Sequence, residues 1–97
     1  MINKKIIEIE GQRGILQIML VLHNNGEMLY GNLYNNKPHV EISNNSTAKR
    51  AIEILMKHKL IYQKEIKGKK AFYYCLTSKG NRFAKCIQDM EKVLTEN

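Results

Sequence analysis

Residues 43–76 read SNNSTAKRAIEILMKHKLIYQKEIKGKKAFYYCL and change from a helical to a β-strand pattern near Lys59. Before Lys59 the apolar side chains recur three and four residues apart, the spacing of one helical face, and residues 43–46 offer candidate N-caps. These apolar residues are Ala48, Ala51, Ile52 and Leu55. At about 100° per residue the opposite face gathers Ser46, Lys49, Arg50, Glu53 and Lys57. The pattern predicts an amphipathic helix with a basic, polar face.

The residues after Lys59 predict a β-hairpin with a cationic tip. Residues 60–66 and 71–76 are rich in β-forming side chains, and KGKK at residues 67–70 is a glycine-containing turn of hairpin length. Lysine side chains at such a tip suit phosphate, because phosphate contact needs charge more than fixed geometry.

The N-terminal third predicts three short elements. Residues 15–22 are apolar except for Gln17 and indicate a buried helix that ends near residues 23–26, with a buried strand as the competing interpretation. Residues 27–29 indicate a very short strand and residues 30–36 a short helix, with a loop after it through Ile42. Tyr30 and Tyr34 border this helix, where aromatic side chains pack in the core more often than they bind phosphate.

A final helix of about 18 residues is expected over residues 77–95, with Thr77 as its N-cap. Its apolar stripe is wider than one small domain covers, and an exposed stripe of this kind marks an interface, so we expect a homodimer. The expected interface residues are Phe83, Ile87, Met90 and Leu94. Residues 1–10 could form a dimerisation arm, read as a helix or a strand, because Ile2, Ile6 and Ile9 have compatible spacing.

Length and composition restrict the class of protein. The 97 residues and 11.3 kDa fit a single domain over residues 1–97, and a composition of 43% hydrophobic and 26% charged residues argues against wholesale disorder. The longest apolar stretch is far shorter than the roughly 18 residues of a membrane span, and MINKKIIEIEG at the N-terminus has no signal-peptide core. We therefore expect a cytoplasmic protein without a membrane partner.

The positive charge is concentrated in the middle of the chain. Residues 44–85 hold eleven basic and two acidic residues, a net charge of +9, whereas the remaining residues hold five basic and seven acidic residues, a net charge of −2. A one-sided positive field attracts and steers a polyanion. A solvated lysine-rich surface is the competing interpretation.

Catalytic and metal-binding patterns are missing from the sequence. We find no paired carboxylates, no nucleophile with a base and no phosphate-cradling glycine loop, so we expect no enzyme and no cofactor. His23, His39 and His58 are scattered, which argues against a metal site. Cys75 and Cys86 resemble no zinc motif, and their positions on a strand and a helix predict buried thiols.

The order of these elements predicts an α+β fold of the winged helix-turn-helix type, with a three-helix core, a two- or three-stranded β wing and a long C-terminal helix. Three stretches resemble winged-helix regulators of the PadR and MarR families: GILQIMLVLHNNGEMLYGNL at residues 14–33, STAKRAIEILMKHKLI at 46–61 and YYCLTSKG at 73–80. Lys59 departs from the glycine that these families carry before Leu-Ile, and a ligand pocket built from a longer helical C-terminal domain is not expected.

The resemblance implies a sequence-specific double-stranded DNA-binding regulator, a dimeric repressor with one helix in the major groove and the wing on phosphates or the minor groove. We expect Arg50 to contact guanine. For Asn45 we expect capping of the helix before pairing with adenine, and for Lys57 contact with phosphate or solvent before contact with a base. The expected DNA-binding residues are Asn44, Asn45, Ser46, Thr47, Lys49, Arg50, Lys57, Lys67, Lys69 and Lys70. A protein-interaction module in a larger assembly and an RNA-binding protein remain the alternatives.

Overall fold

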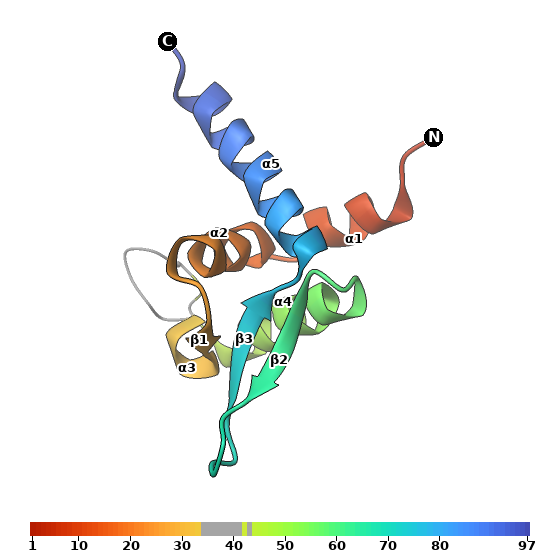
Figure 1. Ribbon diagram of the computed structural model, residues 1–97. Helices are drawn as coiled ribbons and strands as arrows, with labels where there is room; N and C mark the ends of the chain where they lie inside the picture. The colour runs from red at the N-terminus through yellow and green to blue at the C-terminus, as the bar shows by residue number, and fades with distance from the viewer. Residues whose placement is uncertain (34–41, 43) are drawn as a thin grey trace.

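The computed structural model describes residues 1–33, 42 and 44–97 and shows a mixed α+β arrangement (Figure 1). The elements are α1 (Lys4–Gly11), α2 (Ile15–Asn25), β1 (Met28–Leu29), α3 (Tyr30–Leu33), α4 (Asn45–Lys57), β2 (Ile61–Glu65), β3 (Phe72–Leu76) and α5 (Ser78–Thr95). The three strands form one antiparallel sheet in the order β1-β3-β2. The α+β class expected from the sequence is confirmed.

Residues 15–25 form helix α2, so the competing interpretation of a buried strand is wrong. This helix supplies much of the core. It begins after Gly14, whose φ of 96° is a left-handed conformation, and ends before Gly26, whose φ is 79°. Its buried residues are Ile15, Ile18, Met19, Val21 and Leu22. They pack in one cluster with buried residues of α3, α4, β2 and α5.

Helix α4 buries the apolar face that its spacing predicts. Its buried residues are Ala48, Ala51, Ile52 and Leu55. The N-cap is Asn44, whose side-chain oxygen accepts a hydrogen bond from the backbone amide of Thr47 at 2.8 Å. The expectation that Asn45 caps the helix is wrong, because Asn45 is already its first residue.

The hairpin and the last helix also form where the sequence places them. Strands β2 and β3 pair from Ile61↔Leu76 to Glu65↔Phe72. Thr77 caps α5, because its hydroxyl accepts a hydrogen bond from the amide of Gly80 at 2.9 Å. The β2–β3 turn projects at the lower end of Figure 1, and the C-terminal end of α5 projects at the opposite end.

The N-terminal segment is helical in the structure, as α1, although none of its residues is fully buried.

Cys75 is buried as expected, but Cys86 is exposed on α5, so the prediction of a buried thiol is wrong for Cys86. Tyr34 and the end of the helix expected over residues 30–36 lie outside the described residues. None of the helices in the described part of the chain combines the length and apolarity that a membrane span requires.

Candidate nucleic-acid interface

The outer face of α4 presents the charged residues that the helical pattern separates from the core. Lys49, Arg50 and Glu53 are exposed on this face. Within residues 1–33, 42 and 44–97, neither Lys49 nor Arg50 takes part in an ion pair. Their cationic groups are therefore turned to solvent and can meet an external anion without first breaking an internal pair.

The first turn of α4 is held in place by neighbouring elements. The hydroxyl of Tyr30 in α3 donates to the side-chain oxygen of Asn45 and lies 3.3 Å from its backbone oxygen. The Tyr30 ring packs against the core and lies 6.3 Å from the ring of Tyr74 in β3. On the other side, the backbone oxygen of Thr47 accepts a hydrogen bond from the Gln12 side chain at 3.4 Å. The polar residues Asn44, Asn45 and Ser46 remain exposed at this end.

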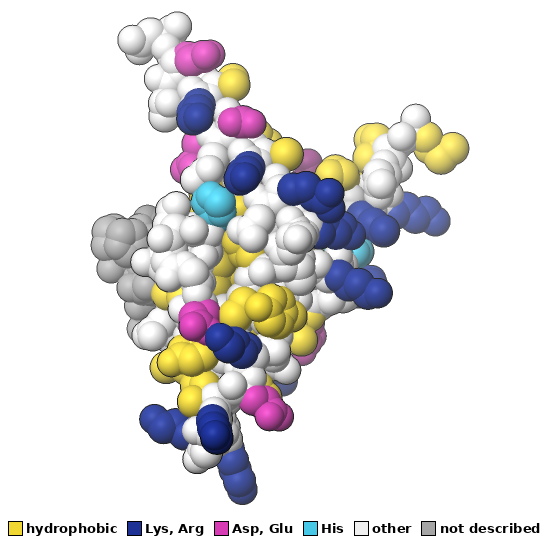
Figure 2. Space-filling view, in the orientation of Figure 1, with side chains coloured by type: hydrophobic (Ala, Val, Ile, Leu, Met, Phe, Trp, Pro, Cys, Tyr) yellow, Lys and Arg dark blue, Asp and Glu magenta, His cyan; other side chains and the backbone are white. Residues whose placement is uncertain are grey.

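The hairpin tip carries three exposed lysines, Lys67, Lys69 and Lys70. The turn is closed by a hydrogen bond from the amide of Ile66 to the oxygen of Ala71 at 3.2 Å, and Gly68 has a φ of 78°. A residue without a Cβ adopts that conformation readily. Basic side chains gather at this projecting tip in Figure 2.

A hollow of about 220 Å³ lies between α4 and the sheet. Its walls are formed by Tyr30, Lys49, Ile52, Glu53, Met56, Gln63 and Tyr74. Gln63 and Tyr74 are paired across β2 and β3, and the Gln63 amide donates to the Tyr74 hydroxyl at 3.1 Å. The exposed face of α4 and one face of the hairpin therefore open onto the same surface.

Two basic residues of the same region are already paired. Lys57, at the end of α4, lies 3.0 Å from a carboxylate oxygen of Glu8 in α1. Lys64, in β2, lies 3.2 Å from a carboxylate oxygen of Glu27, and this hydrogen bond raises the pKa of Lys64. Of the ten residues expected to bind DNA, Lys57 is the one whose charge is paired within the described residues, while Asn45 and Thr47 accept hydrogen bonds from Tyr30 and Gln12.

Gln63, Tyr74 and Met56 are members of this surface that sequence reasoning missed, whereas Glu53 was expected on the polar face of the helix. Strand alternation carries the signal, because Gln63 lies two residues after the buried Ile61 and so faces the same side of the sheet, towards α4. Lys67, Lys69 and Lys70 lie further out on the hairpin, beyond the hollow, and enclose a shallow surface with Ile66 and Phe72.

The four residues expected at a dimer interface divide into two groups. Ile87 is buried within its own chain, and Phe83 packs partly against the core. Met90 and Leu94 are 48% and 82% exposed.

No protein-family model, curated protein or solved structure matches this chain.

Proposed function

We propose that the protein is a winged-helix, sequence-specific double-stranded DNA-binding transcription regulator, with α4 as the recognition helix and the β2–β3 hairpin as the wing. The observation that supports the proposal is the surface that α4 and the hairpin share, which includes Lys49. Lys49 and the neighbouring Arg50 are both exposed on α4 without an ion pair among the described residues. The major groove of duplex DNA admits one helix, and a neighbouring hairpin can then reach the flanking backbone.

The N-terminal half of α4 supplies the groups that read bases. Arg50 has a planar guanidinium that can donate two parallel hydrogen bonds to the O6 and N7 atoms of guanine. Asn45 has its side-chain oxygen engaged by Tyr30, so its amide nitrogen is the group left to donate to a base or a phosphate. Lys49, Ser46 and Thr47 lie in the same two turns and suit phosphate or base-edge contacts.

The hairpin tip supplies sequence-independent affinity. Lys67, Lys69 and Lys70 carry mobile point charges that suit phosphates along the backbone or beside the minor groove. Occupation of a promoter by such a protein blocks transcription without any catalytic group, so repression is the simplest regulatory outcome of the proposal.

The test is binding to duplex DNA selected from a random pool, measured by fluorescence anisotropy. A protein that contacts about 6 to 10 phosphates loses roughly 10³ to 10⁵ in affinity between about 50 and 200 mM salt. Arg50→Ala should weaken binding to the selected site by about 1 to 3 kcal/mol and relax its base preference. Lys85→Ala, which removes an exposed charge from α5, is the matched control and should leave the preference unchanged.

Two results would contradict the proposal. The first is undetectable binding to any duplex DNA at low salt. The second is a preference for structured RNA when the two nucleic acids compete, because the recognition-helix arrangement fits the deep, narrow major groove of RNA poorly. If substitution of both Lys49 and Arg50 by alanine leaves the activity of the protein intact, a protein-interaction module is the better description.

A further inference from the structure

The side chain of Asn45, the first residue of α4, is held by a residue of another helix. The Tyr30 hydroxyl donates a hydrogen bond to Oδ1 of Asn45 and also lies 3.3 Å from the backbone oxygen of Asn45. Asn45 stays exposed, so the contact orients its carboxamide without covering it. The oxygen and the nitrogen of a carboxamide lie on opposite sides of its carbon. The oxygen of Asn45 is thus directed towards α3, and its NH₂ group is directed away from α3.

Tyr30 is a rigid anchor for this hydrogen bond. Its ring packs against the core and lies 6.3 Å from the ring of Tyr74, tilted by 54°. Strand β1 ends directly before Tyr30 and pairs with β3 through Met28 and Leu29. A group whose rotamer is fixed by packing holds its partner more precisely than a mobile group does. The sheet therefore positions the hydroxyl, and the hydroxyl positions the amide.

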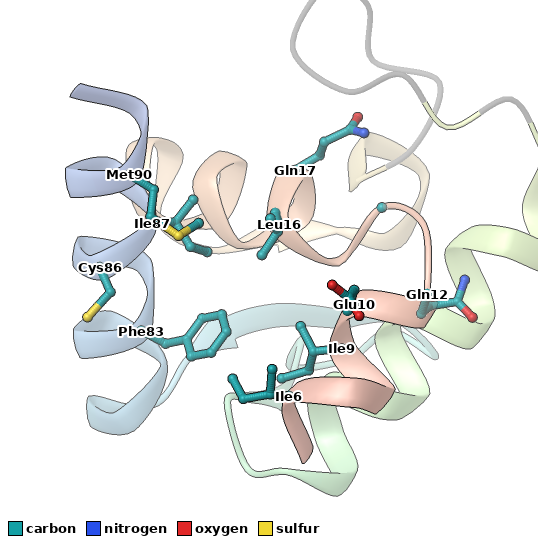
Figure 3. Close-up of a pocket in the computed structure, with 11 residues that line it drawn as sticks. Ile6, Ile9, Glu10, Gln12, Leu16, Gln17, Phe83, Cys86, Ile87 and Met90 are labelled. Atoms are coloured by element: carbon teal, nitrogen blue, oxygen red, sulfur yellow. The ribbon is translucent and has the colours of Figure 1, made fainter. Parts of the chain in front are cut away.

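The backbone around Asn45 is fixed as well. Asn44 caps the helix, and the backbone oxygen of Thr47 accepts a hydrogen bond from the Gln12 side chain at 3.4 Å. Figure 3 shows the Gln12 side chain pointing away from Phe83 and from the apolar groove between α1, α2 and α5. With the first turn of α4 held in this way, the Asn45 amide can change what it presents only by rotation of its own side chain.

The held amide lies on the face of α4 that the proposed function turns towards DNA. Lys49 follows Asn45 by four residues, the spacing of one helical face, and both side chains are exposed. Tyr30 and Lys49 line the same hollow between α4 and the sheet. A duplex that meets Lys49 therefore also meets the NH₂ group of Asn45.

An asparagine that reads adenine uses both ends of its carboxamide. The NH₂ group donates to N7 of the base while the oxygen accepts from the N6 amino group, and guanine has O6 in place of that amino group. An asparagine whose oxygen faces another residue can only donate. Its acceptor on a purine is N7, which adenine and guanine share, so it no longer distinguishes the two purines. Cytosine offers it no acceptor, because the N4 amino group is a donor.

We propose that Tyr30 is a specificity-determining positioning residue of the DNA interface, because it holds Asn45 as a donor to N7 of a purine and prevents it from selecting adenine alone. The proposal rests on the proposed DNA-binding function. Tyr30 touches no base in this arrangement and acts through the side chain of Asn45. Removal of its hydroxyl frees Oδ1 of Asn45, and the side chain can then rotate to use both of its polar ends on one base.

Base preferences selected from a random duplex pool test the proposal. The wild-type chain should tolerate both purines at one position of its site, and a 7-deaza purine there should weaken binding roughly 2- to 10-fold, the contribution of one hydrogen bond. Tyr30→Phe keeps the ring and should shift that position towards adenine by roughly 5-fold or more. Tyr62→Phe, which removes a tyrosine hydroxyl from β2, is the control and should leave every base preference unchanged.

A double-mutant cycle shows whether Tyr30 acts through Asn45. Asn45→Ala should remove the purine preference, and Tyr30→Phe added to Asn45→Ala should change no base preference further. A role of Tyr30 in packing alone would weaken binding to all duplexes equally, and urea unfolding of each variant measures that loss of stability. In the absence of DNA, the NMR signals of the Asn45 side-chain amide should shift in Tyr30→Phe and stay in place in Tyr62→Phe.

The contrary results can be told apart. If wild type and Tyr30→Phe select the same bases, or if the cycle shows no coupling between Tyr30 and Asn45, the role proposed for Tyr30 is wrong and the proposed function stands. A wild-type preference for adenine over guanine at the position that Asn45→Ala affects also overturns this role, because the amide oxygen then reads the base. If no variant binds duplex DNA, the proposed function fails, and the role of Tyr30 fails with it.

Discussion

Gly80 in α5 lies directly against the backbone carbonyl of Leu60, so closely that a Cβ atom at Gly80 would be 1.9 Å from that oxygen. The same oxygen accepts hydrogen bonds from the amide of Thr77 at 3.1 Å and from its hydroxyl at 3.2 Å. The first turn of α5 is thus joined to the backbone that leads from α4 into β2. Glycine at this position lets the two segments approach.

Gly80→Ala should therefore destabilise the protein. The added methyl group meets backbone and not the end of a flexible side chain, so the helix or the strand has to move, at a cost of about 1 to 3 kcal/mol or more. Urea unfolding followed by circular dichroism measures the change. Gly31→Ala is the control, because nothing lies within 4 Å of its added Cβ, and it should unfold at nearly the wild-type urea concentration.

Lys59 is the non-glycine residue with a positive φ in the described segments, at 58°. A side chain in the left-handed region is strained by its Cβ atom, so Lys59→Gly should stabilise the protein by about 1 kcal/mol. Thermal unfolding checks this. Lys85→Gly, in the interior of α5, is the control and should instead lower the melting temperature, because glycine has a low helix propensity. A lower melting temperature for Lys59→Gly would contradict the strain argument.

The elements set by local periodicity were predictable from the sequence. The buried face of α4, the turn at Gly68 and the cap at Thr77 each depend on residues within a few positions of one another. Their apolar spacing and capping chemistry are local, so one sequence displays them.

The contacts between distant segments were not predictable in the same way. The hydrogen bond of Tyr30 to Asn45 and the ion pair of Glu8 with Lys57 join residues 15 and 49 positions apart. No periodicity encodes which face of α1 meets the end of α4. The choice of Asn44 over Asn45 as N-cap also depends on where the first helical turn is fixed, because both residues have the same side chain.

Asn44 should contribute to stability through its cap. Asn44→Ala removes the acceptor for the Thr47 amide and should cost about 1 kcal/mol. Asn44→Asp keeps an acceptor and should retain the wild-type stability, but its negative charge should weaken binding to duplex DNA if α4 enters the major groove. Chemical denaturation and anisotropy measured on the same two variants separate the two roles. Equal stability of Asn44→Ala and wild type would show that the cap is dispensable.

Glu8 in α1 is the centre of a contact with the end of α4. Its carboxylate accepts a hydrogen bond from Lys57 at 3.0 Å and contacts the ring nitrogen Nε2 of His58. The hydrogen bonds from Lys57 and His58 lower the pKa of Glu8 below its ordinary value of 4.5. Lys4 and Lys5 line the same surface hollow as Glu8, Lys57 and His58.

Because the pKa of Glu8 is lower in the folded protein, its contribution to stability is fully present above the ordinary value and is lost as the pH falls through the folded value. Glu8→Gln should therefore lower the melting temperature at neutral pH, and the difference from wild type should shrink in acid. Thermal unfolding at a series of pH values measures this. Glu10→Gln, which removes a carboxylate outside any ion pair in the described segments, should show no comparable pH-dependent difference. A constant Glu8→Gln deficit across the series would mean that the side chain acts through packing and not through its charge.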